Sequence, residues 1–226
     1  MNRVLAVLTA SAVLTVATQA FAGPTVIGSC GTVIKSPGSY VLNRNLSVKM
    51  GGGDCITISS SNVTVDLQGY RINCNSIGTA NGIIASGTQS GITIRNGFVT
   101  GCVNGVDTYT HGATGVLVDE ILALNNSNTG IAVNVKSQVM QSIANGNKNF
   151  AGIFALCPSN IIYNTAINNL PLPPGPGEGA CDSTDTCYND IDWFPQTPCS
   201  FSSCACNFSC NAYDHNQQIG LVGGCP

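Results

Sequence analysis

The chain has 226 residues, only 8% of them are charged, and the net charge is −3. Charged residues make up roughly 25% of an ordinary soluble domain, so glycine, serine, threonine and asparagine must supply the solubility here. The eight lysine and arginine residues are scattered along the sequence, which excludes the basic patch that a nucleic-acid partner requires.

The first 22 residues have the pattern of a signal peptide. Arg3 gives a positive start, residues 4–17 are mostly apolar, and Ala20-Phe21-Ala22 offers a cleavage site. A membrane anchor is disfavoured because serine and threonine interrupt the apolar run and no basic stop follows. Lipid attachment at Cys30 is disfavoured because this cysteine lies too far beyond the run. We therefore expect residues 1–22 to be removed on export to the periplasm or cell exterior, with no membrane span left.

Residues 23–53 are interpreted as an N-terminal cap. The apolar segments 32–35 and 40–42 flank a Pro-Gly turn, and Gly51-Gly52-Gly53 follows as a flexible joint. Two short apolar runs around such a turn predict two strands. A cap is needed because the repeat that follows would otherwise begin with an unpaired strand edge.

Residues 54–169 repeat one short pattern, in which a turn residue, usually a glycine, and a β-branched residue open each copy. The copies begin at Asp54, Asn81, Asn104, Thr129 and Ala151. After the first copy, the glycine-to-glycine steps are 23, 25 and 22 residues, which is typical of stacked repeats. Apolar residues two apart follow each start, and this period indicates strands. The sequence predicts an all-β, single-stranded parallel solenoid of about six rungs, with three short strands per turn.

Asparagine recurs at one corner of the repeat, at Asn126, Asn147 and Asn169. Stacked amides can hydrogen-bond to each other along a solenoid. We therefore interpret these residues as a structural ladder and not as a ligand site.

All 12 cysteines follow the predicted cleavage site, and an even, high count in an exported chain favours disulfides. Cys30 and Cys55 are 25 residues apart, and Cys74 and Cys102 are 28 apart, each close to one period. Neighbouring rungs lie about 4.8 Å apart, a separation of Cα atoms that a disulfide tolerates. We predict Cys30–Cys55 and Cys74–Cys102 as disulfides between rungs.

The repeat ends at Asn169, where a proline- and glycine-rich linker begins at residues 170–180. Residues 181–226 are too poor in apolar residues for a core of their own, so we expect a disulfide-rich C-terminal cap, a flap folded over the open end. The cysteines expected to pair in this flap are Cys157, Cys181, Cys187, Cys199, Cys204, Cys206, Cys210 and Cys225.

The flap also suggests other kinds of site. Zinc or copper could be bound by Cys204 and Cys206 together with Cys199, Cys210 and His215, but their spacing matches no known finger and export favours disulfides. Four aspartates between residues 182 and 192 suggest calcium but lack the glycine and glutamate of an EF-hand loop. We expect no cofactor, with calcium as the alternative. The aromatic residues able to stack on a sugar ring, or to seat the flap, are Tyr188, Trp193 and Phe194.

Several stretches carry a resemblance to a known family: Gly38-Ser39-Tyr40-Val41-Leu42, residues 54–58, residues 62–69 and residues 91–97. Across residues 30–169 the chain resembles the right-handed parallel β-helix repeat family of the pectate-lyase-like superfamily. This resemblance implies a right-handed parallel β-helix. The superfamily includes polysaccharide lyases, hydrolases and epimerases, and also binding and surface proteins without catalysis, so the resemblance leaves the function open.

Aligning the rungs places Asp66, Arg95 and Asp119 next to one another on one outer face. Enzymes of the superfamily carry charged side chains on such a face, which implies that Arg95 could act as a base or carboxylate clamp, with the aspartates holding calcium. We favour an exposed ion-pair ladder instead. Hydrolysis fits less well, because two rungs separate the aspartates by roughly 9–10 Å, the far edge of the range for inverting glycosidases.

The loop at residues 107–112 is the longest interruption inside the repeat and holds His111. Tyr109 and His111 could act as acid and base in a β-elimination, with Asp107 beside them. We favour a polar surface loop, because no partner base is visible.

The sequence predicts an exported, non-catalytic protein that presents a polar β face to a glycan or another cell-surface component. A second hypothesis is a small lyase or epimerase acting on uronic acid polymers through Arg95, Asp119, Asp107 and His111. A third is a periplasmic metal-binding accessory protein that uses the flap.

Overall fold

The structure is a computed structural model that describes residues 23–76, 78–156 and 158–169, together with the backbone of four strands between residues 188 and 222. The predicted signal peptide, the linker and the rest of the flap lie outside the described residues. The described part consists of strands and turns without helices, so it contains no helix suited to crossing a membrane.

The strands are short and follow one another closely along the chain. In order they are β1 (Thr25–Ile27), β2 (Thr32–Ile34), β3 (Gly38–Leu42), β4 (Leu46–Ser47), β5 (Ile56–Ile58), β6 (Val63–Asp66), β7 (Arg71–Asn73), β8 (Ile83–Ala85), β9 (Thr93–Thr100), β10 (Val106–Asp107), β11 (Leu117–Leu124), β12 (Ile131–Val133), β13 (Gln138–Met140), β14 (Ile143–Asn145), β15 (Ile153–Leu156), β16 (Asn160–Ile162), β17 (Thr165–Ile167), β18 (Tyr188–Asp190), β19 (Asn207–Ser209), β20 (Asn211–His215) and β21 (Gln218–Val222).

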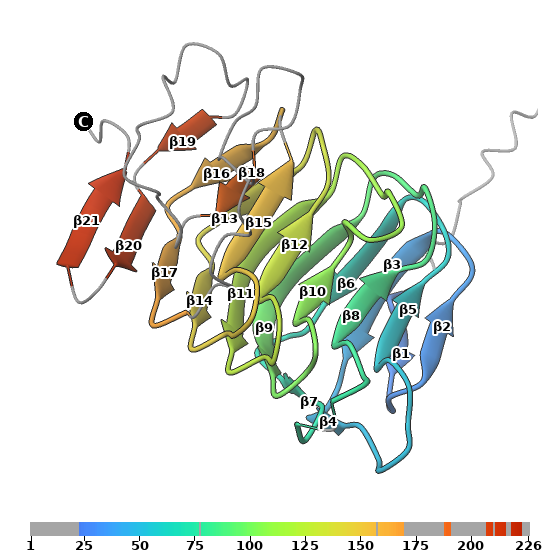
Figure 1. The fold of residues 1–226 in the computed structure, drawn as a ribbon. Helices are drawn as coiled ribbons and strands as arrows, with labels where there is room; N and C mark the ends of the chain where they lie inside the picture. Colours follow the sequence, from blue (N-terminus) through green and yellow to red (C-terminus); the bar gives the residue numbers. More distant parts are fainter. Residues whose placement is uncertain are drawn as a thin grey trace, which may run out of the picture.

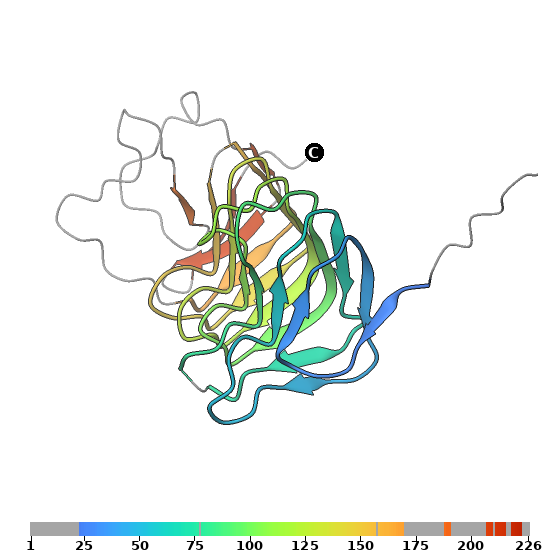
Figure 2. The ribbon, with the colours of Figure 1, turned by 90° about the vertical axis from the view of Figure 1, so that its right-hand side faces the viewer.

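The strands stack into three faces of a parallel solenoid (Figures 1 and 2). Face 1 contains β2, β5, β8, β10, β12 and β15. Face 2 contains β1, β3, β6, the first half of β9 and of β11, β13 and β16, and face 3 contains β4, β7, the second half of β9 and of β11, β14 and β17. The six parallel strands of face 1 mark six rungs, which confirms the predicted all-β parallel solenoid.

The register of the rungs matches the repeat in the sequence. The β-branched residues that open the copies pair in succession along face 1, and all are fully buried: Ile56, Ile83, Val106, Ile131 and Ile153. The second apolar run pairs in the same way along face 2, through Val65, Ile94, Val118, Val139 and Ile161. These side chains fill the interior, and the alternate residues of each strand point outward.

The repeated glycines allow neighbouring rungs to approach closely. A Cβ atom at Gly105 would lie 2.5 Å from the carbonyl oxygen of Gly130 and 2.9 Å from the side-chain nitrogen of Asn126. Gly82 and Gly130 are crowded in the same way by the next glycine carbonyl. The glycines at these three positions are therefore required by space, whereas the first copy has Cys55 there.

The predicted asparagine ladder is confirmed. Asn126 Nδ2 donates to Asn147 Oδ1 at 2.8 Å, and Asn147 Nδ2 donates to Asn169 Oδ1 at 2.7 Å. Asn126 and Asn147 are fully buried. Because each amide binds the next one, the ladder satisfies buried polar groups at the corner that follows face 3.

Both predicted disulfides between rungs are present, with Cα separations of 4.0 Å for Cys30–Cys55 and 4.7 Å for Cys74–Cys102. The other predicted disulfide cysteines, from Cys157 to Cys225, lie outside the described residues. Strands β18, β19 and β20 pair with β15, β16 and β17, so part of the cysteine-rich segment adds strands to the last rung.

Candidate functional site

The charged residues predicted on one outer face are neighbours on face 2. Asp66 is the Cα partner of Arg95 on β6 and β9, and Arg95 is the partner of Asp119 on β9 and β11. Their neighbours along the strands, Val65, Ile94 and Val118, point into the core. The charged side chains therefore form a column across three rungs on the outside of the solenoid.

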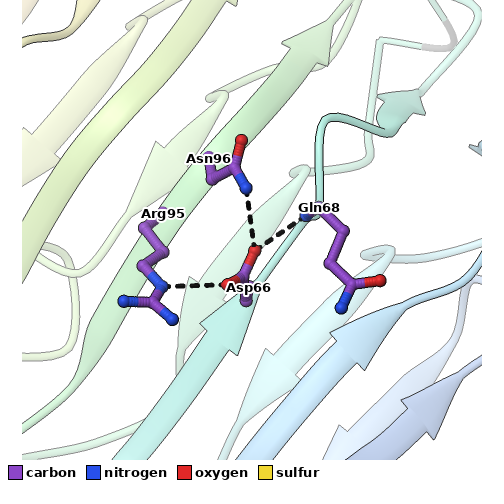
Figure 3. Close-up of polar contacts among 4 residues, drawn as sticks. All are labelled: Asp66, Gln68, Arg95 and Asn96. Atoms are coloured by element: carbon purple, nitrogen blue, oxygen red, sulfur yellow. Dashed lines mark hydrogen bonds and ion pairs between the residues drawn. The ribbon is translucent and has the colours of Figure 1, made fainter.

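Asp66 is fully engaged within this column (Figure 3). Its Oδ2 receives a hydrogen bond from Arg95 Nε at 3.0 Å. Its Oδ1 receives one from the backbone N–H of Gln68 at 2.8 Å and one from Asn96 Nδ2 at 3.3 Å. A carboxylate with three donors around it orients the arginine and is poorly placed to act as a base or to hold calcium.

Arg95 is held at Nε only. Its side chain is 52% exposed, and within the described residues its terminal nitrogens Nη1 and Nη2 donate no hydrogen bond. Figure 3 shows Nε of Arg95 directed at Asp66, with no dashed line from either terminal nitrogen. A guanidinium oriented in this way can bind two oxygen atoms of a ligand side by side.

Asp119 does not join the ion pair, which corrects the predicted three-residue ladder. The single ion pair among the described residues joins Arg95 to Asp66. Asp119 Oδ1 is buried and accepts no hydrogen bond from any described residue. Leaving a buried acceptor without a partner costs about 1–3 kcal/mol. Because this oxygen is buried, a ligand can reach Asp119 only at the exposed part of its side chain.

Apart from the exposed Glu120 that follows Asp119, the surroundings of the column are uncharged. The adjacent column of face 2 carries Thr64 and Thr93, which are Cα partners on neighbouring rungs. Met140 follows Asp119 in the charged column. The charged column is therefore a short polar site on a flat, mostly neutral sheet.

Asp107 belongs to a different site. It lies on β10 in face 1 and is 3% exposed. Its carboxylate accepts hydrogen bonds from the backbone N–H groups of Tyr109 and Thr110, the hydroxyl of Thr110 and the side-chain amide of Asn104. These bonds fix the loop at residues 107–112, where His111 is exposed. Among the described residues, no hydrogen bond or ion pair joins this loop to Arg95 or Asp119.

Sequence reasoning missed an aromatic cluster on the outside of face 1. The ring of Phe154 lies 4.8 Å from the ring of Tyr109 and 5.0 Å from that of Phe150, measured between centroids. Phe150 is 38% exposed and Phe154 is buried. Phe150 and Phe154 lie four residues apart on one rung, whereas Tyr109 follows β10, two rungs earlier. The sequence therefore gave little signal for the contact between Tyr109 and Phe154. The side chains of the predicted stacking residues Tyr188, Trp193 and Phe194 lie outside the described residues.

The described residues hold no cluster suited to a metal ion. In the part of the chain that the structure describes, no three His, Cys, Asp or Glu side chains gather closely enough to hold a metal ion. The cysteines and His215 of the flap, and the aspartates between residues 182 and 192, are not among the side chains described.

Comparisons of the chain with protein-family models, with curated protein sequences and with solved structures gave no match. The parallel solenoid of about six rungs is consistent with a β-helix fold, and no family model assigns the chain to a family.

Proposed function

We propose that this chain is an exported, non-catalytic β-helix protein that binds a glycan on face 2. The observation that carries the proposal is an exposed guanidinium beside a second carboxylate on the adjacent rung. Arg95 presents terminal nitrogens that bind no described residue, and Asp119, its partner on the next rung, is partly exposed and outside the ion pair. Export is supported by the signal pattern of residues 1–22 and agrees with the two disulfides.

Sugar chemistry suits this pair of groups. The guanidinium of Arg95 can donate to two hydroxyl oxygens of one ring, and Asp119 can accept from a hydroxyl about one rung away. The threonine column beside them offers further hydroxyl groups on the same flat surface. A polymer lying along the solenoid axis would meet this column over three successive rungs.

Binding without catalysis is supported by the state of the carboxylates. The Asp66 carboxylate accepts three hydrogen bonds. The Asp107 carboxylate, on another face, is buried and accepts four. An elimination or hydrolysis needs an acid and a base on either side of one bond. No such pair surrounds Arg95 among the described residues.

The first test is a glycan array probed with the wild-type chain and the Arg95→Ala variant. Hydrogen bonds to a charged group contribute about 1.5–3 kcal/mol each, so we expect the variant to bind its glycan roughly tenfold more weakly or worse. Lys148→Ala removes an exposed cation from another part of the surface and is the matched control. Equal binding by wild type and Arg95→Ala would contradict the proposal, as would an array without any bound glycan.

The uronate lyase or epimerase is the alternative that the free guanidinium favours. It is tested by following the ultraviolet absorbance of unsaturated uronate products, and the epimer ratio, over a panel of polyuronates. Turnover by the wild type that is lost in Arg95→Ala would favour the enzyme hypothesis over glycan binding without catalysis. The metal-binding alternative is tested by counting free thiols by mass spectrometry, because free thiols with bound metal would exclude the disulfide-rich flap.

A further inference from the structure

Face 3 begins one rung later than face 2. Face 2 starts with β1, which pairs with β3, whereas face 3 starts with β4, which follows β3 along the chain. Between β1 and β2 the chain passes through residues 28–31, which form no strand. Among the described residues, β4 therefore pairs with β7 on one side and with no strand on the other.

A cavity lies beside the open edge of β4. Its volume is about 470 Å³, and its lining consists of residues 28–31, residues 45–49, Gly52 and Gly53. Pockets that bind ligands usually measure roughly 300–1,000 Å³. The cavity therefore has room for a ligand between the strand edge and two glycine-rich loops.

The backbone of β4 offers hydrogen-bonding groups at this edge. The N–H of Val48 donates to the carbonyl oxygen of Asn73 on β7 at 2.9 Å. Successive residues of a strand direct their backbone groups to opposite edges. The N–H and the carbonyl group of Ser47 therefore face the open edge, and Ser47 also lines the cavity.

The surroundings of this edge are basic. Residues 23–53 contain no acidic residue and three exposed cations, Lys35, Arg44 and Lys49. Lys49 follows β4 closely and lines the cavity. The next carboxylate along the chain is that of Asp54, whose Oδ1 accepts two hydrogen bonds from Asn81 of the following rung. A ligand at the open edge therefore meets a positively charged surface.

We infer that the exported chain binds an extended, acidic segment of a partner polypeptide, which pairs with β4 as an added first strand of face 3. Addition of a strand to an exposed sheet edge is a common mode of peptide binding. The donor and acceptor of Ser47 match the backbone of an extended peptide, and Lys49 matches a carboxylate beside it. A second copy docked by the same end would bring two basic surfaces together, so charge disfavours it. This inference is independent of the glycan site on face 2.

A simpler explanation is that Lys49 only protects the edge, as lysines near edge strands commonly do. On that explanation no peptide pairs with β4, whatever its charge. The two explanations therefore predict opposite results in a binding experiment.

The first test is fluorescence anisotropy of a labelled hexapeptide with alternating glutamate and valine, added to the exported chain at low salt. We expect saturable binding. The same peptide with lysine in place of glutamate is expected to bind roughly tenfold more weakly or worse, because it has the same charge as the surface.

Two further hexapeptides keep the glutamates and carry N-methyl groups on alternate residues. The peptide methylated on the residues that face β4 cannot donate to the carbonyl oxygen of Ser47, so we expect it to lose binding. The peptide methylated on the other residues is expected to keep it. This comparison leaves the protein unchanged and tests strand pairing directly.

Variants of the chain locate the contact. Ser47→Pro removes the N–H at the open edge and spares the pairing with β7, to which Val48 donates. We expect it to bind the acidic hexapeptide roughly tenfold more weakly. Ser47→Ala keeps the N–H and is the matched control. Lys49→Glu is expected to weaken binding roughly fivefold, whereas Lys148→Glu changes an exposed lysine that does not line the cavity and leaves binding unchanged.

Four results would overturn the inference: no binding at millimolar hexapeptide, equal binding of the two methylated peptides, equal affinities of Ser47→Pro and Ser47→Ala, or no effect of Lys49→Glu. A dimer of the exported chain, seen by light scattering and dissociated by Ser47→Pro, would also overturn it, because a second copy would then occupy the edge. Arg95→Ala is expected to bind the hexapeptide normally, which separates this result from the glycan proposal.

Discussion

Gly105 has no side chain because the next rung occupies the place of its Cβ atom. The same crowding at Gly82 and Gly130 explains why glycine returns in three successive copies of the repeat. At these positions the stacking of the rungs, and not a turn, selects the residue. The glycine pattern in the sequence therefore follows directly from how closely the rungs pack.

Gly105→Ala tests this link. The added methyl group forces the rungs apart, and overpacking of this kind costs about 1–3 kcal/mol. We expect the free energy of unfolding, measured by denaturant titration, to fall by that amount. Gly53→Ala is the control, because a Cβ atom at Gly53 meets nothing within 4 Å. Equal midpoints for the two variants would show that the glycines are not required by space.

At the scale of the strand, the bend between faces 2 and 3 depends on single residues in the left-handed conformation. Strands β9 and β11 pass from one face to the other at Asn96, with φ of 59°, and at Glu120, with φ of 52°. Asparagine tolerates this conformation, but glutamate does so less readily. Glu120 is exposed, so its backbone conformation can be tested apart from core packing.

Glu120→Gly is expected to raise the free energy of unfolding by about 1 kcal/mol, because glycine adopts a positive φ without steric cost. Glu120→Val is expected to lower it, since a β-branched residue is strained there. Thermal unfolding of both variants measures the difference. If the two variants were equally stable, the bend at Glu120 would not be fixed by its left-handed backbone.

The disulfides act at the same scale, since each joins two neighbouring rungs. Replacing Cys74 and Cys102 by serine frees a loop closed over 28 residues. Loss of such a disulfide costs about 2–4 kcal/mol, mainly because the unfolded chain gains freedom. Denaturant titration of the double variant should give a decrease of that size. No decrease would mean that hydrogen bonds between the rungs already suffice.

At the scale of the whole molecule, the sequence predicted the features that recur from rung to rung. The register, the Asn126–Asn147–Asn169 ladder and both disulfides follow from the residue spacing of the repeat, because every copy has the same geometry. The candidate site on face 2 was predicted from the sequence only in part. The rung alignment brought Arg95 beside Asp66 and Asp119, but which aspartate binds it depends on side-chain conformation. The aromatic cluster joins Phe154 on β15 to Tyr109 from a loop two rungs earlier, a contact that no local pattern predicts.

The most direct test of the glycan proposal is to map the contact surface on the intact exported chain. NMR chemical shifts should be followed while the glycan selected by the array is added to the labelled protein. The proposal predicts shifts concentrated at Arg95, Asp119 and their neighbours on β6, β9 and β11, and lost in Arg95→Ala. Shifts concentrated on face 1, around Phe150 and Tyr109, would contradict it.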